Sequence, residues 1–281
     1  MKNGIIGGLT FKEMAKRVWR GAEEDHAFGR AAELSYYFLL ALFPMLIFLT
    51  SLVGFMPGIQ DNIIDAVAKV APRQAVSLVR DFLADVVANR SGGLISFGIL
   101  GTLWAASTGA AAVMGALNAA FSATEERPYW RTRLIATGLT ISLSLMVAGG
   151  TALVMFARRL GSWIAELLGL GAVLTIVWSL LGYLIGLILL LMGIQVIYYF
   201  GPNVKRKWQW ITPGAAFATA AFIITSELFS LYLRFGPGYS ATYGSLGAVI
   251  ILMVWLYLMG LLLIFGGEID SEIRAARDLS A

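Results

Sequence analysis

Charged residues in this chain are gathered into short clusters, with long uncharged stretches between them. No Lys, Arg, Asp or Glu occurs in six stretches of 19 to 38 residues, at positions 34–60, 91–124, 134–157, 167–204, 208–226 and 235–267. A helix of about 20 residues crosses a hydrocarbon core of about 30 Å. The pattern therefore predicts six transmembrane helices, at approximately 32–56, 94–121, 134–157, 172–200, 211–233 and 244–267.

Two segments outside these stretches are amphipathic. Residues 10–24 place apolar side chains on one helical face and basic side chains on the other, and Thr10 and Glu13 have the spacing of a capping box. We expect this helix to lie on the inner leaflet near anionic lipid headgroups, with a gate or partner-docking helix as the alternative. Residues 57–93 contain two further amphipathic stretches separated by Pro72, which we expect to cap the outer ends of the spans.

The composition agrees with a membrane protein and excludes ordinary soluble, disordered and fibrous classes. Hydrophobic residues make up 58% of the chain, charged residues 14%, and the mean hydropathy is +0.77. We predict an all-α polytopic membrane protein with six transmembrane helices and short amphipathic interfacial helices. Its parts are a cytoplasmic N-terminal segment (1–30), the bundle (31–267, with an extracytoplasmic loop at 57–93) and a cytoplasmic tail (268–281).

The distribution of basic residues predicts the orientation. Fourteen Lys and Arg residues lie in the N-terminal segment, the 122–133 and 201–210 loops and the tail, whereas seven lie in the other three loops. The positive-inside rule then places both termini in the cytoplasm of a bacterial cell, with the protein in its inner membrane. The first 30 residues lack a cleavable signal pattern, so we expect the first span to act as an uncleaved targeting signal.

The sequence offers little chemistry for an enzyme. It has no cysteine, a single histidine, and no HExxH, GxSxG, Walker or Rossmann pattern. His26 lies beside three acidic residues, which favours a solvated polar stretch over a metal site. We therefore expect no enzymatic activity, no metal and no cofactor. Because the basic loops match the topology signal, we expect no nucleic acid partner either.

Two carboxylates lie inside the predicted spans and are the leading functional candidates, because a charge in hydrocarbon is costly unless it is paired or hydrated. Glu33 is near the cytoplasmic start of the first span, where snorkelling toward water is the alternative interpretation. Glu227 is about two-thirds of the way through the fifth span, and we expect a hydrated cavity or a hydrogen-bonding partner there.

Further pathway candidates come from the first span and from the last extracytoplasmic loop. Pro44 predicts a kink, and with Tyr36 and Tyr37 it could line a polar vestibule. Tyr239, Tyr243 and Gly244 belong to a Gly- and Tyr-rich segment that reads either as an ordinary turn with interfacial aromatics or as a broken-helix entrance. The second span has almost no side-chain bulk, and we interpret it as the closely packed central helix.

Several strings, in one order along the chain, resemble the YihY/virulence factor BrkB family. They are LSYYFLLALFP (34–44), GALNAAF (115–121), YFGPN (199–203), WITPGA (210–215), YGSLGAVIILMVWLYL (243–258) and GGEID (266–270). The resemblance implies a six-span bacterial inner-membrane protein with both termini inside. It singles out the matched positions Tyr36, Pro44, Asn118, Pro202, Asn203, Pro213, Gly214, Tyr243, Gly244 and Glu268 for testing.

The leading functional hypothesis is a transporter or exporter of an amphiphilic or anionic solute, including a lipid-linked one. Its partners would be the lipid bilayer, anionic headgroups and an unidentified solute. The alternative is a non-transporting scaffold or envelope-assembly factor. The resemblance also brings the older label ribonuclease BN, but no nuclease site maps onto these residues. The sequence does not decide whether the chain forms a homo-oligomer.

Overall fold

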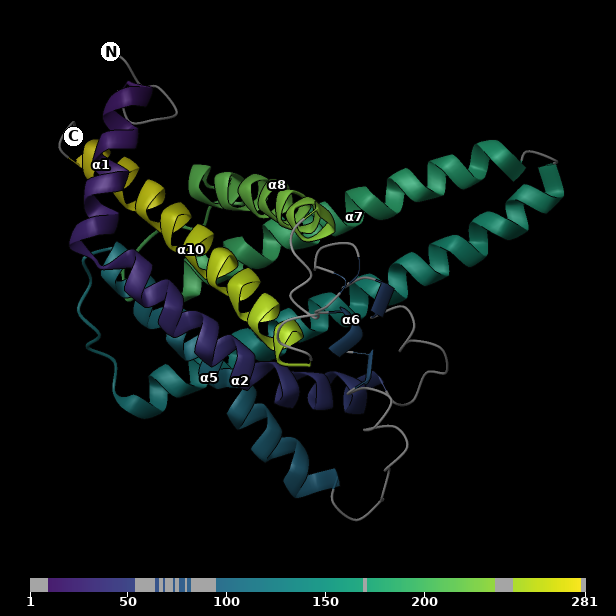
Figure 1. Ribbon diagram of the computed structural model, residues 1–281, viewed down its shortest axis with the longest axis horizontal. Coiled ribbons are helices and arrows are strands. Elements are labelled where there is room, and N and C mark those ends of the chain that lie inside the picture. The colour runs from purple at the N-terminus through teal and green to yellow at the C-terminus, as the bar shows by residue number, and fades with distance from the viewer. Residues whose placement is uncertain are drawn as a thin grey trace.

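The computed structural model describes residues 10–53, 64–65, 68, 73, 76–78, 80–81, 95–168, 171–235 and 245–278. Within these ranges the regular structure is entirely helical (Figure 1). The helices are α1 (Phe11–Glu24), α2 (Ala27–Val53), α5 (Ile95–Ala120), α6 (Tyr129–Leu168), α7 (Gly171–Phe200), α8 (Pro213–Phe235) and α10 (Ser245–Asp278). This confirms the all-α prediction, while most of the predicted amphipathic loop at 57–93 lies outside the described residues.

Four of these helices are long and apolar enough to cross a membrane. The candidate spans are Tyr129–Val154, Leu180–Phe200, Pro213–Phe235 and Leu246–Asp278. They correspond to the last four of the predicted spans. The helices α2 and α5 overlap the first two predicted spans and contain 27 and 26 residues.

The N-terminal helix α1 starts as its capping box predicts. The Glu13 backbone N–H donates to Thr10 Oγ1 (3.3 Å), and the Thr10 N–H donates to Glu13 Oε2 (2.9 Å). Part of its apolar face packs against α10, where Met14 and Val18 contact Ile273. Ala22 of the same face is buried in the main core, whereas Phe11 and Trp19 are exposed. The expectation that this helix lies on the inner leaflet near anionic headgroups stays a prediction.

A tight turn at His26 separates α1 from α2. Its φ of 53° falls in the left-handed region, which histidine enters more readily than branched residues do. The Arg30 N–H donates to the His26 carbonyl (3.0 Å), so the next helix begins directly after the turn. The helix α2 then continues through Pro44 to Val53.

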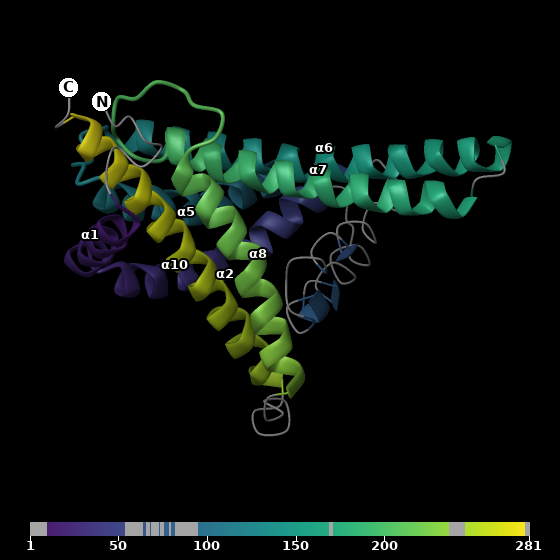
Figure 2. The ribbon, with the colours of Figure 1, turned by 90° about the horizontal axis from the view of Figure 1, so that it is seen from above.

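The helices α6 and α7 form a long antiparallel hairpin that projects from the rest of the molecule (Figures 1 and 2). At 1.5 Å per residue, the 40 residues of α6 extend about 60 Å, which is twice the hydrocarbon thickness. Side chains of α7 fill the space beside two glycines of α6: Leu189 lies against Gly150, and Trp178 lies against Gly161. The predicted third span (134–157) is thus the middle of a longer helix, because no proline interrupts the chain between Ala157 and Leu168.

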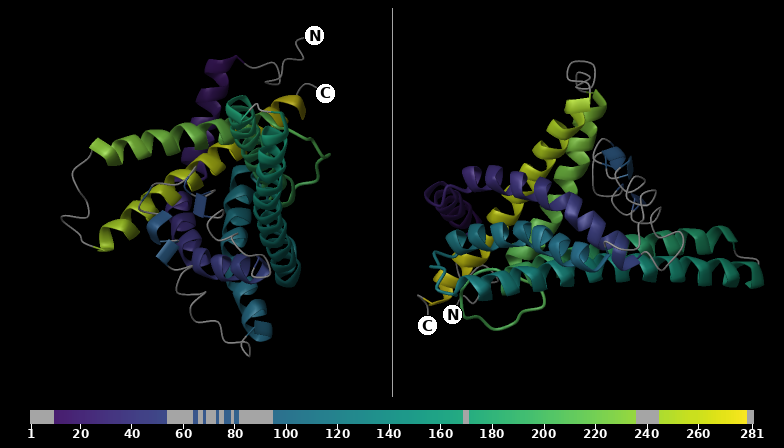
Figure 3. Two further views of the ribbon diagram at one scale, coloured as in Figure 1. Left: turned by 90° about the vertical axis from the view of Figure 1, so that its right-hand side faces the viewer. Right: turned by 90° about the horizontal axis from the view of Figure 1, so that it is seen from below.

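The helices converge at one end and diverge at the other. The α6–α7 hairpin and the α8–α10 pair separate with distance from the end where α1 meets α10 (Figures 2 and 3). The main core lies at the convergence and draws residues from α1, α2, α5, α7, α8 and α10. At its centre Tyr198 is fully buried and donates from its hydroxyl to the Leu263 carbonyl (2.7 Å).

Candidate functional site

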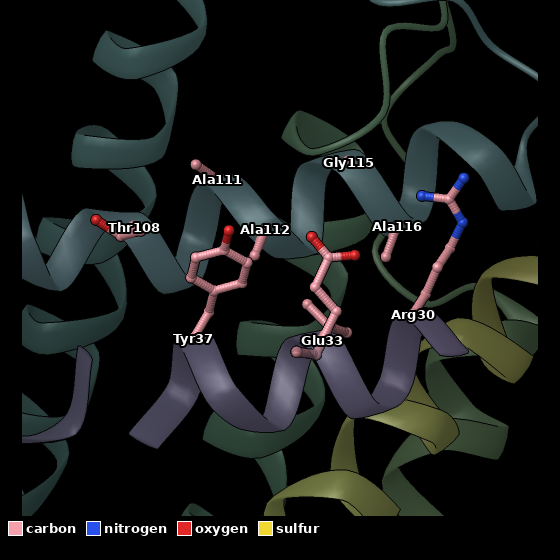
Figure 4. A pocket seen from close by; sticks show the side chains of 9 residues that line it. Arg30, Glu33, Tyr37, Thr108, Ala111, Ala112, Gly115 and Ala116 are labelled. Carbon is pink, nitrogen blue, oxygen red and sulfur yellow. The ribbon is translucent and has the colours of Figure 1, made fainter. Parts of the chain in front are cut away.

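A cavity of about 260 Å³ lies between α2 and α5 near the converging end of the bundle. The residues that line it on α2 are Arg30, Glu33, Leu34 and Tyr37, and those on α5 are Thr108, Ala111, Ala112, Gly115 and Ala116. Figure 4 shows the carboxylate of Glu33 and the ring of Tyr37 directed from α2 toward α5, with the Arg30 guanidinium at one end. The cavity thus brings together two of the residues predicted from the sequence.

The cavity exists because the residues of α5 opposite Glu33 are small. A Cβ placed on Gly115 would meet no atom within 4 Å. One and a half turns earlier the same helix touches α2 closely, since a Cβ on Gly109 would lie 3.1 Å from the Ala41 Cβ. The small residues of α5 therefore serve both functions, close packing at Gly109 and open space at Gly115.

Basic side chains flank the carboxylate of Glu33 at both ends of this cavity. Arg30 lies one helical turn before Glu33, and its Nε donates to the Asp25 carbonyl (2.9 Å). At the other end, Thr108 Oγ1 accepts a hydrogen bond from Arg133 Nη2 of α6 (3.3 Å). The Arg133 guanidinium also stacks over the Trp104 ring, 4.1 Å from its centroid. The cavity therefore contains charges of both signs among small and apolar residues of α2 and α5, and Arg133 of α6 contacts its Thr108 end.

Asn118 does not line this cavity. It is 6% exposed and joins two connections of the chain, because its Nδ2 donates to Glu125 Oε2 (2.8 Å) and its Oδ1 accepts from the Asn203 N–H (2.6 Å). The neighbouring Arg127 pairs with Glu125 (2.6 Å) and donates to the Gly201 carbonyl (2.9 Å). The hydrogen bond from Arg127 lowers the pKa of Glu125. In this arrangement Asn118 fastens the α5–α6 connection to the α7–α8 connection.

The other predicted residues are dispersed. Glu227 is exposed on α8 beside Ile224 and Leu228, has no hydrogen-bonding partner among the described residues, and does not line the cavity between α2 and α5. Tyr36 is exposed and contacts the Tyr37 ring edge-on. Pro44 lies within α2, beyond the cavity. The remaining candidates, Tyr239, Tyr243 and Gly244, lie outside the described residues.

Among the residues whose burial the structure describes, the most deeply buried carboxylates are two that the sequence predicts in the cytoplasmic tail. Glu268 is 2% exposed and Asp270 is 7% exposed, and both belong to α10, which continues unbroken to Asp278. Glu33 and Glu227, the two carboxylates that the sequence places within predicted spans, are both exposed on the isolated chain. The adjacent pair Gly266 and Gly267 was the available signal, since glycine pairs permit close helix contact.

Glu268 and Asp270 face different neighbours because residues two positions apart on a helix lie about 200° apart. Glu268 faces α1, where a Cβ on Gly21 would lie 2.8 Å from its Oε2. Asp270 faces α8, where its Oδ1 accepts the Gly214 N–H (2.7 Å). The strings WITPGA and GGEID, far apart in the sequence, are therefore in direct contact.

Comparison with known proteins decides the family. The family described as virulence factor BrkB matches residues 18–280. The chain belongs to the virulence factor BrkB family. All the strings that carry the resemblance in the sequence lie within the matched residues. The match also covers every described helix of this BrkB-family protein from α2 to α10.

Several relatives of this BrkB-family protein are membrane proteins by name. YfkH of Bacillus subtilis strain 168, whose name marks it as ribonuclease-like, is 38% identical over 251 residues, covering 89% of this chain and 91% of YfkH. UPF0761 membrane proteins of Alteromonas mediterranea and Tolumonas auensis are 28% and 26% identical, covering 90% and 94% of this chain and 85% and 86% of their own. No solved structure matches the chain. Together with the apolar helices, these matches establish a membrane protein.

Among the described residues, no three His, Asp or Glu side chains gather closely enough to hold a metal ion. Asp25, in the turn between α1 and α2, has Glu268 of α10 as an acidic neighbour. Burial raises the pKa of Asp25, while the hydrogen bond from Glu268 opposes this shift.

Proposed function

We propose that this BrkB-family protein is a transporter or exporter of an amphiphilic or anionic solute, including a lipid-linked one. The observation that carries the proposal is the cavity between α2 and α5. It contains a carboxylate, a phenol and a guanidinium within helices that consist otherwise mainly of apolar residues. An ionisable group at such a position is a candidate for a transport pathway because it is costly in hydrocarbon unless it is hydrated.

The proposal includes six spans in the inner membrane with both termini in the cytoplasm. Four helices meet the length and composition of a span, and α2 and α5 are long enough to supply two more. The basic α5–α6 and α7–α8 connections are hydrogen-bonded to each other, so they lie at the same end of the bundle. That arrangement is compatible with the excess of basic residues on the cytoplasmic side.

We also propose the bilayer itself as a partner of α1. Phe11 and Trp19 are 80% and 52% exposed, and Lys12 and Lys16 are exposed as well. Apolar and basic side chains on one helix are suited to the headgroup region of an anionic membrane surface.

The test compares the lipids and metabolites of cells that contain the wild-type protein, no protein, or the Glu33→Gln variant. The variant keeps the shape of the side chain and removes its charge. We expect it to abolish most of the difference between cells with and without the protein. Glu126→Gln, at an exposed position of the α5–α6 connection, is the matched control and is expected to behave as the wild type. Full activity of Glu33→Gln at equal membrane abundance would remove Glu33 from the mechanism.

The second candidate function is a membrane scaffold, which the exposed position of Glu227 favours. The scaffold hypothesis is supported, and the transporter hypothesis is rejected, if two results occur together. Cells with Glu227→Gln or Glu33→Gln keep the wild-type lipid and metabolite profile, and cells with substitutions on the exposed face of α1 lose it. We propose no catalytic role for either carboxylate. RNA cleavage by the purified protein that disappears on substitution of a defined acidic cluster would contradict that part of the proposal.

A further inference from the structure

A second cavity, of about 280 Å³, lies at the α7–α8 connection, between the end of α7 and the last turns of α10. Its charged lining is mainly basic. The basic residues are Lys205, Arg206, Lys207, Arg274 and Arg277, and the acidic ones are Asp270 and Asp278. Arg274 and Asp278 form an exposed ion pair at 3.8 Å. The cavity therefore has an excess of positive charge on its walls.

Arg206 is the central feature of this cavity. Its guanidinium lies against two aromatic rings, 5.2 Å from the Phe121 centroid and 5.9 Å from the Tyr199 centroid. Its Nε and Nη2 atoms are both buried and have no hydrogen-bond acceptor among the described residues. Burial lowers the pKa of this guanidinium, and the charge of Asp270 opposes the shift. A buried donor without an acceptor destabilises the fold, and a charged donor does so more strongly than a neutral one.

The two unpaired nitrogens form one edge of the guanidinium. Nε–H and one Nη2–H point in the same direction, as two parallel donors, and this fork matches the spacing of two oxygens of a phosphate or carboxylate group. The guanidinium carbon lies over the faces of both rings, and neither ring supplies a hydrogen-bond acceptor to this edge.

Asp270 does not satisfy Arg206. Its Oδ1 accepts the Gly214 N–H near the start of α8, and its Oδ2 is buried without a partner. No ion pair within 4.0 Å joins Arg206 and Asp270 among the described residues. The cavity thus presents a bidentate donor and a separate buried acceptor.

We propose that this cavity binds a phosphate group, which accepts hydrogen bonds from the Nε and Nη2 edge of Arg206. A hydroxyl of the phosphate, or a donor group attached to it, fits the free Oδ2 of Asp270. The excess positive charge favours phosphate over a monoanionic carboxylate. The phosphate belongs either to a lipid headgroup or to a soluble phosphate compound, since both present the same oxygens. The proposal goes beyond the transport function, because it concerns binding at a second site.

The experiment measures binding to the full-length protein in a maltoside detergent, which contains no phosphate. Inorganic phosphate and glycerol 3-phosphate are titrated by calorimetry, and phosphatidic acid is titrated in mixed micelles. We expect Arg206→Gln to weaken binding at least about tenfold, because both charge-assisted hydrogen bonds are lost. Arg206→Lys retains the charge but lacks the fork, so it is expected to bind with intermediate affinity.

Arg20→Gln is the matched control, because Arg20 is an exposed residue of α1 and its substitution makes the same change in net charge. It is expected to bind as the wild type does. The melting temperature of each variant reports folding, and Arg206→Gln is expected to fold because two of the nitrogens it loses have no protein acceptor.

The ligands distinguish the two sources of phosphate. Binding of the soluble compounds that depends on Arg206 supports a free phosphate compound, and binding of phosphatidic acid alone that depends on Arg206 supports a lipid headgroup. If Arg206→Gln binds all three ligands as tightly as the wild type, or if the wild type binds none, the proposal is overturned. Neither outcome depends on transport, so failure here is distinguishable from failure of the proposed function.

Discussion

Two glycines of α5 show what a sequence pattern predicts about helix packing and what it does not. The sequence predicts that α5 is poor in side-chain bulk, and it correctly indicates close packing at Gly109, which touches Ala41 of α2. It gives no reason to treat Gly115 differently, although Gly115 faces open space. Whether a small residue permits contact or leaves a cavity depends on the partner helix, and the order of residues along α5 contains no information about that partner.

The burial of the carboxylates also depends on partner helices that the sequence pattern does not identify. Charge patterning selects Glu33 and Glu227 because they lie within uncharged surroundings in the sequence. Glu268 and Asp270 lie inside a charged cluster, yet they are the buried pair, because α1 covers one and α8 covers the other. Burial by helices distant in the sequence is a tertiary effect, so hydropathy along the chain could not predict it.

Asp25→Asn is expected to weaken the dependence of stability on pH. Because burial raises the pKa of Asp25 above its ordinary value of about 3.9, the folded protein holds this proton more tightly than the unfolded chain does. The stabilisation is complete below that ordinary value and is lost as the pH rises through the raised pKa of the folded state. Melting temperatures from about pH 4 to about pH 8 measure this slope. The control Glu126→Gln should keep the wild-type slope, and an unchanged slope in Asp25→Asn would refute the account.

At the scale of elements, the periodicity of the sequence predicts that a helix exists more accurately than it predicts where that helix begins and ends. The capping box at Thr10 and the amphipathic pattern correctly predict α1, since both signals are local. The boundaries of α6 and α10 differ from the predicted spans because charge marks where a helix leaves hydrocarbon, whereas the helix itself ends where backbone hydrogen bonding ends. Both helices continue through the charged residues that were expected to follow the spans.

Val18→Asp is expected to release α1 from α10. Val18 is 7% exposed and contacts Met14 and Ile273, so an aspartate there would place an unpaired carboxylate in an apolar contact at a cost of several kcal/mol. Limited trypsin digestion, followed by mass spectrometry, measures cleavage after Arg17 and Arg20. We expect cleavage to be about tenfold faster in the variant.

The matched control for α1 is Ala15→Asp, one turn from Val18 and on the exposed face of the same helix. It introduces the same charge without burying it, and digestion at the wild-type rate is expected. Equal rates for Val18→Asp and Ala15→Asp would show that the packing of α1 on α10 contributes little to its protection.

At the scale of the whole molecule, the predicted alternation of connections agrees with the arrangement of the helices. The α5–α6 and α7–α8 connections lie together, at the end where α1 meets α10, and the helices diverge toward the other end (Figure 3). That these two connections share one end is predictable because basic residues are distributed asymmetrically among the connections. The divergence is not, because the sequence does not define the angle between the α6–α7 hairpin and the α8–α10 pair.

Cysteine labelling tests the orientation, because the chain contains no cysteine of its own. Single cysteines are placed at Glu126, in the α5–α6 connection, and at Phe235, the exposed end of α8. The α5–α6 connection lies beside the start of α8, so the two positions are separated by the length of α8. A membrane-impermeant thiol reagent is expected to label Glu126→Cys from the cytoplasmic side and Phe235→Cys from the other. Labelling of both from one side would contradict the six-span topology.

The central claim is that solute passes the cavity between α2 and α5, and filling that cavity tests it most directly. In Gly115→Leu the new side chain enters open space, so folding and abundance should be retained. The control Gly138→Leu places the same side chain on the exposed surface of α6, where a Cβ also meets no atom within 4 Å. Lipid and metabolite profiles are then compared with those of cells that lack the protein. The account predicts that Gly115→Leu resembles the absence of the protein and Gly138→Leu resembles the wild type; a wild-type profile for Gly115→Leu at equal abundance would contradict it.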